Sequence, residues 1–332
     1  MAITCEVKQE KQRKQDLGIF YTRPEIVDFI YDILLVWKEE EDRHTGRWES
    51  HKPKHYPSVI DPACGEGIFL KKAIEKQFTI PKYVWGVDID IHAKDKWQEI
   101  NLLKSFGSEA DLDIHFIHQN GLLPLNSDKI LRYKRGGLKE FDAVIGNPPY
   151  GGIGVDLSSH PTAEGIKLLE SLRAFRIFTY KNKKRNNGDN YVNGLFDALV
   201  AEPIATYSGI NSREAESIPI EVLFIERFIQ LSKEGGWIAI IIPEGILSNS
   251  NMHYVREFIA DNTKVEAIVS LPRDAFKHVG TAAKTSILFL KKQKMDTMNY
   301  PVFLASLNKM GAEGLTQISE QYKEFFYEGK LK

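Results

Sequence analysis

Phe141-Asp142-Ala143-Val144-Ile145-Gly146-Asn147-Pro148-Pro149-Tyr150 is the stretch that decides the fold. Its first six residues are mostly apolar and have the length of a buried strand. Two prolines follow soon after, and because proline has no N–H to donate to a sheet ladder, the strand must stop there. In open α/β sheets, ligands bind at the carboxyl ends of the strands. The stretch therefore predicts a site where the Asn147 amide, the Pro148 carbonyl and the Tyr150 ring face a cleft.

These three groups suit one kind of chemistry. An exocyclic amino group, such as adenine N6, is a poor nucleophile because its lone pair is delocalised into the ring. The Asn147 side-chain oxygen and the Pro148 carbonyl would each accept one amino hydrogen and draw the nitrogen toward tetrahedral geometry. Tyr150 would stack on the base, as aromatic side chains do on flipped nucleotides. The competing interpretation is a plain Pro-Pro turn with a structural tyrosine.

The composition bounds the class of protein. The 332 residues are 42% hydrophobic and 27% charged, with a formal net charge of −1, and this length suits one large α/β domain with insertions. No apolar run approaches the length of a membrane span, and the start has no signal-peptide pattern. We therefore expect a cytoplasmic protein. Two cysteines and nine histidines without paired spacing predict no disulfide framework and no metal site.

A glycine-rich turn lies upstream of the decisive stretch. Residues 59–70 read Val-Ile-Asp-Pro-Ala-Cys-Gly-Glu-Gly-Ile-Phe-Leu, the pattern of a strand, a tight turn and a helix start. Gly65 and Gly67 allow a ligand to approach the backbone closely, and the free amides of the helix favour a carboxylate. Asp61 would repel a phosphate but attract an ammonium or sulfonium group. The turn therefore favours S-adenosylmethionine over a dinucleotide.

A second predicted strand ends in two acidic residues. Residues 84–90 read Val-Trp-Gly-Val-Asp-Ile-Asp. A carboxylate at such a strand end can accept hydrogen bonds from both ribose hydroxyls of an adenosyl group. We assign this role to Asp88 rather than Asp90, because Asp88 follows the Gly-Val of the strand directly.

Strands and helices alternate along the chain. Further strands are predicted at 114–120, 142–145, 237–243, 265–271 and 285–290, and helices follow at about 92–106, 220–232 and 251–260. An earlier helix begins near Pro24, where Thr22 and Glu25 have the spacing of a capping box. The alternation predicts an α/β fold with a doubly wound, mostly parallel seven-stranded sheet and helices on both faces.

The domain organisation follows from the same pattern. Residues 1–16 are expected to form a flexible N-terminal arm, and residues 17–294 a catalytic domain with an insertion at about 151–220. Residues 295–332 are expected to form a C-terminal tail or the start of a further region. Within the insertion, six basic residues between Arg173 and Arg185 alternate with aromatic ones. This stretch is interpreted as a DNA-contacting loop or as a solvated insertion.

Taken together, the motifs resemble those of the adenine-N6 DNA methyltransferases. Phe20-Tyr21-Thr22 resembles the segment that contacts the cofactor in this family. This segment precedes the glycine loop, and the loop precedes Asn-Pro-Pro-Tyr, which is similar to the gamma-type order. Residues 235–247 and Leu271-Pro272 look most like modification subunits of type I restriction-modification systems and related type II enzymes. The resemblance implies a Rossmann-like S-adenosylmethionine-dependent fold. It also implies methyl transfer to the N6 of an adenine flipped out of double-stranded DNA.

The resemblance also implies residue roles. The catalytic residues would be Asn147, Pro148, Pro149 and Tyr150. The cofactor-binding residues would be Phe20, Tyr21, Thr22, Asp61, Ala63, Gly65, Gly67, Asp88, Asn120 and Asn147. Many relatives carry an aspartate at the position of Asn120, and an amide oxygen can accept the same hydrogen bond without the charge. Phe276 matches the position that stacks the flipped base opposite Tyr150, with core cover for a loop as the alternative.

Two other functions stay open. A glutamine side-chain amide is also a planar NH2 group, so the motif fits a protein glutamine-N5 methyltransferase. The chain could also be a non-catalytic DNA-binding subunit with the same fold. The segment after Lys294 is too short for a domain that reads base edges. We therefore expect a partner, either a specificity subunit or a recognition domain missing from this chain.

Overall fold

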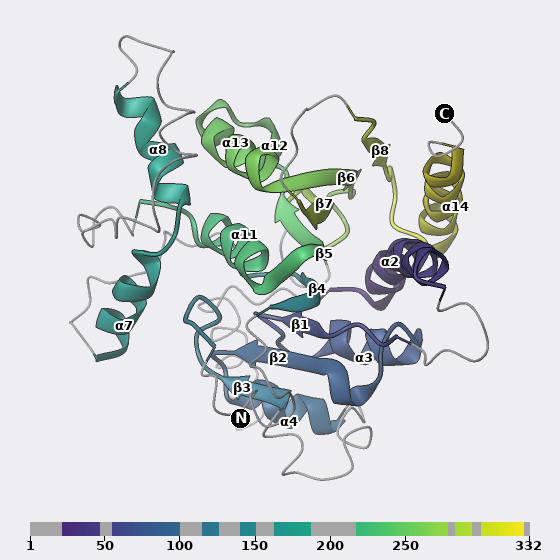
Figure 1. Ribbon diagram of the computed structural model, residues 1–332, viewed down its shortest axis with the longest axis horizontal. Coiled ribbons are helices and arrows are strands. Elements are labelled where there is room, and N and C mark those ends of the chain that lie inside the picture. Colours follow the sequence, from purple (N-terminus) through teal and green to yellow (C-terminus); the bar gives the residue numbers. More distant parts are fainter. Residues whose placement is uncertain are drawn as a thin grey trace, which may run out of the picture.

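The computed structural model describes residues 22–46, 55–99, 115–125, 140–150, 163–186, 217–277, 283–293 and 300–328. An eight-stranded sheet lies at its centre, in the order β3-β2-β1-β4-β5-β7-β6-β8 (Figure 1). The strands are β1 Val59–Asp61, β2 Val84–Asp88, β3 Phe116–His118, β4 Phe141–Gly146, β5 Ser232–Pro243, β6 Thr263–Ser270, β7 Thr285–Lys292 and β8 Phe303–Ser306.

The strand pairing confirms a doubly wound α/β fold. β1 pairs in parallel with both β2 and β4, and β2 pairs in parallel with β3. β4 pairs in parallel with β5, whereas β7 runs antiparallel to β5 and β6. The chain reaches one edge at β3 and then returns to the other side of β1 to form β4. The crevice for a ligand is therefore expected at the carboxyl ends of β1 and β4, where the strand order reverses.

The predicted count of seven strands was wrong by one. The eighth strand, β8, pairs in parallel with β6. It lies in the segment that was expected to be a tail or the start of a further region. The strand has only four residues, alternating between half-buried and exposed, so its apolar pattern is too short to stand out in the sequence.

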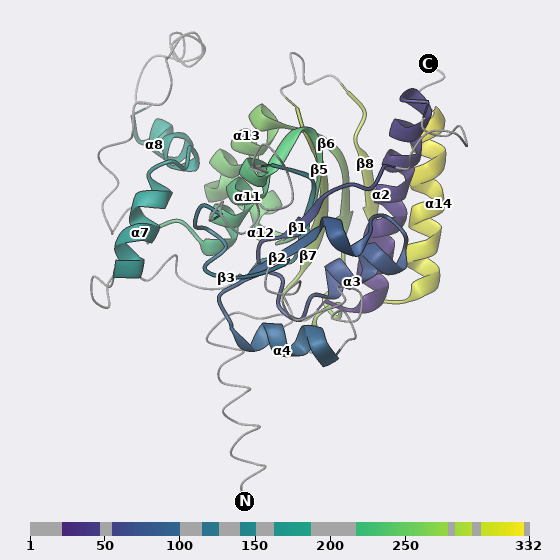
Figure 2. The same cartoon turned by 60° about the horizontal axis from the view of Figure 1, so that its bottom comes forward.

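Helices cover both faces of the sheet (Figure 2). On one face lie α2 Pro24–His44, α3 Ile68–Glu75, α4 His92–Glu99 and α14 Ala312–Glu328. On the other face lie α11 Ile220–Leu231, α12 Gly245–Ser248 and α13 His253–Asn262, with α7 Ala163–Leu172 and α8 Ile177–Asn186 packed outside them. Two single 3-10 turns, Pro81–Tyr83 and Ser250–Met252, complete the described elements.

Strand β5 shows why a run of apolar residues forms the centre of this sheet. Trp237, Ala239 and Ile241 belong to the hydrophobic core on the α2 side. Ile238, Ile240 and Ile242 belong to the core on the α11 side. A strand buried on both faces has no polar face to show, so its sequence is continuously apolar. No helix among the described residues is long and apolar enough to span a membrane.

The start of α2 differs from the predicted capping box. The N-cap residue is Arg23, and no side chain caps the helix. Pro24 occupies the first turn, where its missing N–H costs nothing. The Thr22 hydroxyl instead accepts a hydrogen bond from the side chain of Asn147. At the other end of the helix, Trp37 donates from its indole nitrogen to the hydroxyl of Tyr322 in α14, so α14 is part of the same core.

The insertion is anchored through a buried carboxylate. Glu226 in α11 is 2% exposed. Its two oxygens accept hydrogen bonds from the backbone N–H groups of Arg176 (2.6 Å) and Ile177 (2.8 Å) at the start of α8. The aromatic residues of this stretch, Phe178 and Tyr180 among them, are buried against the α11 side. The aromatic part of the predicted DNA-contacting loop is therefore core, and does not offer its rings for base stacking.

Glu226 gives a prediction about stability and pH. Burial raises its pKa from 4.5 to about 7, although hydrogen bonds from the two backbone N–H groups lower it. Because the folded protein binds this proton more tightly than the unfolded chain, the stabilisation is complete below about pH 4.5 and is lost as the pH rises to about 7. The glutamine of Glu226→Gln cannot ionise. Between pH 4.5 and about 7, the free energy of unfolding of wild type should therefore fall by about 3 kcal/mol more than that of the variant.

The measurement is the free energy of unfolding in urea for both proteins at several pH values. Glutamine keeps an oxygen for one of the two N–H groups and loses the acceptor for the other at every pH. The ionisation is therefore isolated by the difference in pH dependence between the two proteins, not by their difference in stability at one pH. Parallel stability curves for the two proteins would contradict the prediction.

Candidate active site

The carboxyl ends of three neighbouring strands form the candidate site. β4 ends at Gly146 and continues directly into Asn147, while β1 ends at Asp61 and β2 at Asp88. β1 lies between β2 and β4 in the sheet (Figure 1). The strands thus bring the amide predicted to be catalytic and both carboxylates predicted to bind cofactor to one edge, as the sequence indicated.

The Asn147 amide is oriented by two neighbours. Its nitrogen Nδ2 donates to Thr22 Oγ1 at 3.1 Å, and its oxygen Oδ1 accepts from the Tyr150 hydroxyl at 2.6 Å. In this orientation the amide oxygen faces the tyrosine and the amide nitrogen faces the threonine. An amide oxygen has two lone pairs and can accept a second hydrogen. Thr22 therefore helps to orient the predicted catalytic residue.

Tyr150 is held as a neutral donor. The residue is 5% exposed, and burial raises the pKa of its hydroxyl well above the ordinary value, with a smaller upward effect from the charge of Glu221. The hydrogen bond with Asn147 acts in the opposite direction and does not cancel the effect of burial. The hydroxyl consequently keeps its proton at physiological pH and donates a hydrogen bond to the Asn147 oxygen.

Asp61 packs against the strand that carries Asn147. It is 1% exposed, and its Oδ1 accepts from the backbone N–H of Ala63 at 3.0 Å. A Cβ atom built on Gly146 would lie 2.4 Å from this oxygen. Burial raises the pKa of Asp61 well above its usual range, and the charge of Asp88 adds to this. Only glycine at position 146 leaves room for the carboxylate.

Gly146→Ala is therefore expected to displace Asp61. We expect overpacking to cost about 1–3 kcal/mol of folding free energy. We also expect S-adenosylmethionine to bind at least about tenfold more weakly, because the displaced Asp61 would no longer stand where it attracts the cation; tenfold corresponds to about 1.4 kcal/mol of binding free energy. Gly311→Ala is the matched control, since a Cβ there meets no atom within 4 Å. Calorimetric titration and thermal unfolding measure the two effects, and unchanged affinity in a folded Gly146→Ala protein would refute the prediction.

Asp88 holds the glycine loop in place. Its Oδ2 accepts from the backbone N–H of Gly65 at 2.7 Å and its Oδ1 from that of Asp90 at 2.8 Å. Burial raises the pKa of Asp88, while these backbone hydrogen bonds lower it without cancelling the rise. Each carboxylate oxygen has a further lone pair with which it can accept a hydrogen bond from a ligand.

The two loop glycines are required for different reasons. Gly65 has φ +46°, and a Cβ there would meet no atom within 4 Å, so the backbone borders open space. Gly67 has φ +78°, and a Cβ there would lie 2.7 Å from Trp97 Nε1. The same indole nitrogen donates to the Gly65 carbonyl at 3.1 Å. Trp97 thus packs against the loop at both glycines and holds it in place. The sequence offers no signal for this role.

The donor set fits a cationic ligand. Within the described part of the chain, neither Asp61 nor Asp88 forms an ion pair, and burial raises the pKa of both. A positive group beside them would lower the cost of keeping the two carboxylates ionised. The ammonium and sulfonium of S-adenosylmethionine supply such charge, and the open space next to Gly65 allows close approach.

The remaining predicted residues differ in what the structure shows. Asn120 follows β3, and its Oδ1 accepts from the backbone N–H of Leu122 at 3.0 Å. A Cβ on the adjacent Gly121 would lie 1.9 Å from the Pro62 carbonyl oxygen, so this turn lies against the glycine loop. Phe20 and Tyr21 lie outside the described residues.

Phe276 is 0% exposed and belongs to the hydrophobic core on the α2 side. A fully buried ring offers no face to a base in this conformation. The geometry therefore favours core cover, the alternative interpretation of Phe276. Base stacking by this residue stays a prediction.

A family model described as N-6 DNA methylase matches residues 7–164 and 209–324. Similar curated proteins include a type II methyltransferase of Thermus thermophilus, 26% identical over 210 residues, which cover 63% of this chain and 34% of that protein. A type II methyltransferase of Haemophilus influenzae is 20% identical over 314 residues, covering 94% of this chain and 45% of that protein. The chain thus spans less than half the length of these relatives.

Two solved structures share the fold. A putative class I S-adenosylmethionine-dependent methyltransferase from Listeria monocytogenes aligns with a TM-score of 0.56 at 22% identity, covering 96% of this chain and 77% of that one. A modification subunit of a putative type I restriction enzyme from Vibrio vulnificus aligns with a TM-score of 0.54 at 18% identity, covering 96% and 56%. At these identities the likeness concerns the fold.

Proposed function

Because this chain belongs to the N-6 DNA methylase family, we propose that it transfers a methyl group from S-adenosylmethionine to adenine N6 in double-stranded DNA. The methylation would be the modification step of a restriction-modification system. One observation carries the proposal. The Asn147 amide, oriented by Thr22 and Tyr150, stands at the end of β4 beside the strand that ends in the buried carboxylate of Asp61.

The residues around the glycine loop would hold the cofactor. When bound, S-adenosylmethionine supplies a methyl group on a positively charged sulfur. Asp88 would accept hydrogen bonds from the ribose hydroxyls with its remaining lone pairs, and Asp61 would attract the positive charge. Ala63, Gly65 and Gly67 would line the loop beside them. Asn120 would accept from the adenine amino group of the cofactor.

The groups after β4 would activate the substrate amine. The Asn147 oxygen and the Pro148 carbonyl would each accept one hydrogen of adenine N6, and Pro149 would keep the turn extended. This polarisation raises the electron density on the nitrogen where the new bond forms. The neutral hydroxyl of Tyr150 holds the Asn147 oxygen in place, and the ring would stack on the flipped base. The proton released from the product amine leaves to water.

Tritiated S-adenosylmethionine tests the reaction. The label should appear in duplex DNA and, after digestion to nucleosides, in N6-methyladenine. Label found only in a protein acceptor would instead support a glutamine-N5 methyltransferase. If calorimetric titration shows no binding of S-adenosylmethionine at all, the chain is a non-catalytic subunit and the proposed reaction is wrong.

Recognition of the DNA target sequence would depend on a partner. The chain spans less than half the length of the curated relatives, and one solved protein with this fold is a modification subunit of a putative type I restriction enzyme. A specificity subunit or an additional recognition domain would read the base edges. We therefore expect the chain alone to methylate many adenine contexts at similar low rates, as sequencing of the treated DNA would show.

A further inference from the structure

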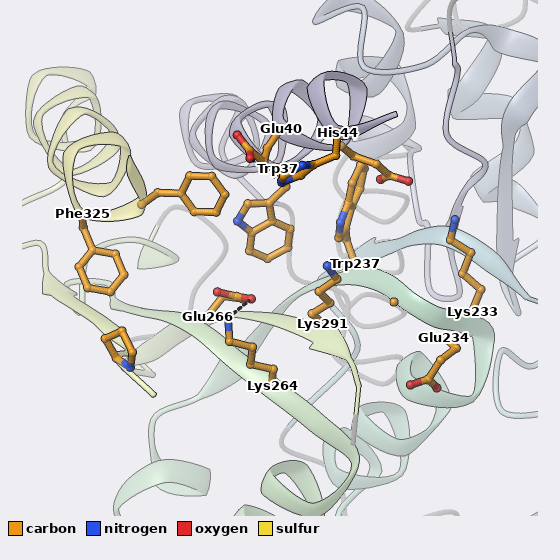
Figure 3. Close-up of a pocket in the computed structure, with 14 residues that line it drawn as sticks. Trp37, Glu40, His44, Lys233, Glu234, Trp237, Lys264, Glu266, Lys291 and Phe325 are labelled. Atoms are coloured by element: carbon orange, nitrogen blue, oxygen red, sulfur yellow. Dashed lines mark hydrogen bonds and ion pairs between the residues drawn. The ribbon is translucent and has the colours of Figure 1, made fainter. Parts of the chain in front are cut away.

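A pocket of about 530 Å³ opens at the edge of the sheet opposite the candidate active site (Figure 3). It lies where β5 and β6 begin and β7 ends, between the last turns of α2 and α14. Its volume lies in the range of ligand sites in proteins. Aromatic side chains and charged side chains of both signs line it.

Three lining residues form a row across the sheet. Trp237 in β5 is the register partner of Lys291 in β7, and Lys291 is the register partner of Lys264 in β6. Residues opposite each other on antiparallel strands have Cβ atoms about 4.5–5.5 Å apart, and like charges at such positions destabilise a sheet. The pairing of Lys291 with Lys264 therefore destabilises the folded sheet, and a bound anion would reduce this repulsion.

Among the described residues, only one of the two ammonium groups has a carboxylate partner. Lys264 pairs with Glu266 at 2.8 Å and lies 5.7 Å from the centroid of the Tyr300 ring. Lys291 forms no hydrogen bond or ion pair within the described part of the chain. Figure 3 shows Lys291 and Trp237 next to each other in the middle of the pocket.

Trp237 adds an uncharged donor at the same place. The residue is 4% exposed, and across the described ranges its indole N–H makes no hydrogen bond. Trp37 packs beside it with ring centroids 6.4 Å apart. The centre of the pocket thus combines an ammonium, an indole N–H and aromatic surface, which together suit a carboxylate attached to an apolar group.

The rim of the pocket carries more carboxylates than cations. Glu40 and Glu41 lie in the last turns of α2, whose C-terminal end adds partial negative charge. Glu234 lies across from them on β5. Lys233 also lines the rim but pairs with Asp142. Glu40 already pairs with His44 at 2.8 Å, which leaves Glu41 and Glu234 without an ion pair among the described residues. A nucleic acid would bring phosphates against these carboxylates and be repelled. A protein segment with basic residues on either side of an acidic one would match both the rim and the centre.

We propose that this pocket is a docking site for a partner protein, which inserts an acidic side chain with an adjacent apolar residue between Trp237 and Lys291. Basic residues on either side of that acid would face Glu41 and Glu234 on the rim. The pocket lies at the amino edge of the parallel strands, whereas the candidate active site lies at their carboxyl edge. A docked partner therefore leaves the DNA side open, and the proposal does not depend on which reaction the protein performs.

The test is a selection of random dodecapeptides displayed on phage, performed against the whole chain. Wild type should enrich peptides that carry Asp or Glu next to an apolar residue and between Lys or Arg. Lys291→Glu should not enrich them. A synthesised wild-type binder should bind Lys291→Glu at least about tenfold more weakly, and its Asp→Lys derivative should recover affinity for Lys291→Glu.

The controls separate docking from misfolding and from simple anion binding. Lys309→Glu makes the same charge change at an exposed residue outside the pocket lining and should bind like wild type. Lys291→Glu should unfold cooperatively at about the temperature of wild type, because it breaks no ion pair among the described residues and the like-charge pair that it removes offsets the new carboxylate. The proposal is overturned if no peptide is enriched, if both proteins enrich the same peptides, or if inorganic phosphate at millimolar concentration displaces the binder.

Discussion

Replacing Asn147 with alanine is expected to lower the rate of methyl transfer by about 10²–10³-fold, the usual cost of removing one preoriented hydrogen-bonding group from an active site. The substitution removes the oxygen that accepts from Tyr150 and the nitrogen that donates to Thr22. The proposed cofactor site around Asp61 and Asp88 keeps its own backbone contacts. Affinity for S-adenosylmethionine should therefore change little.

Tyr150→Phe is the matched comparison for this prediction. It keeps the ring for stacking and removes only the hydroxyl that orients the Asn147 amide. A single neutral hydrogen bond contributes about 0.5–1.5 kcal/mol, so the rate should fall by about 2–10-fold. Single-turnover transfer of tritiated methyl to DNA measures both variants, and calorimetry measures cofactor binding. An Asn147→Ala protein that works at the wild-type rate would show that the site lies elsewhere.

Replacing Asp88 with alanine is expected to weaken the binding of S-adenosylmethionine by about 10–100-fold, because hydrogen bonds to a charged acceptor contribute about 1.5–3 kcal/mol. The loss has two sources. The ribose hydroxyls would lose their acceptor, and the Gly65 N–H would lose the carboxylate that holds the loop. At saturating cofactor the rate of methyl transfer should recover to within a few-fold of wild type, because the groups after β4 are unchanged.

Asp90→Ala distinguishes between the two acidic residues at this strand end. Asp90 accepts from the backbone N–H of His92 at 3.0 Å, a contact at the start of α4. Its replacement should affect stability more than cofactor affinity. Burial raises the pKa of Asp88, so cofactor binding should weaken on acidification at a higher pH than an ordinary aspartate would cause. If Asp90→Ala weakens binding more than Asp88→Ala, the assignment of the ribose acceptor is wrong.

Much of the candidate site could be predicted because its signals are local. The apolar run before Asn147 and the prolines after it specify where β4 stops. Gly65 and Gly67 both have positive φ values, as expected of glycines in a tight turn before a helix. The order of strands and helices along the chain determined the doubly wound sheet, since parallel strands need crossover connections and these are formed by helices.

The contacts between distant segments could only come from the tertiary structure. Thr22 was expected to cap a helix, but it accepts a hydrogen bond from Asn147, which lies 125 positions away. For Phe276 the sequence left base stacking and core cover open, and the structure places it in the core. Neither outcome follows from a local pattern, because one side chain type can serve as cap, contact or core according to what packs against it.

Sequence alone therefore determined which strand ends carry chemical groups, because a strand and its stop are set by backbone preferences a few residues long. The tertiary structure decided which of those groups meet. It placed Asp61 against Gly146, joined β8 to the sheet and brought Lys291 beside Lys264 across neighbouring strands. Such contacts depend on the register and packing of whole elements, which no short stretch of sequence contains.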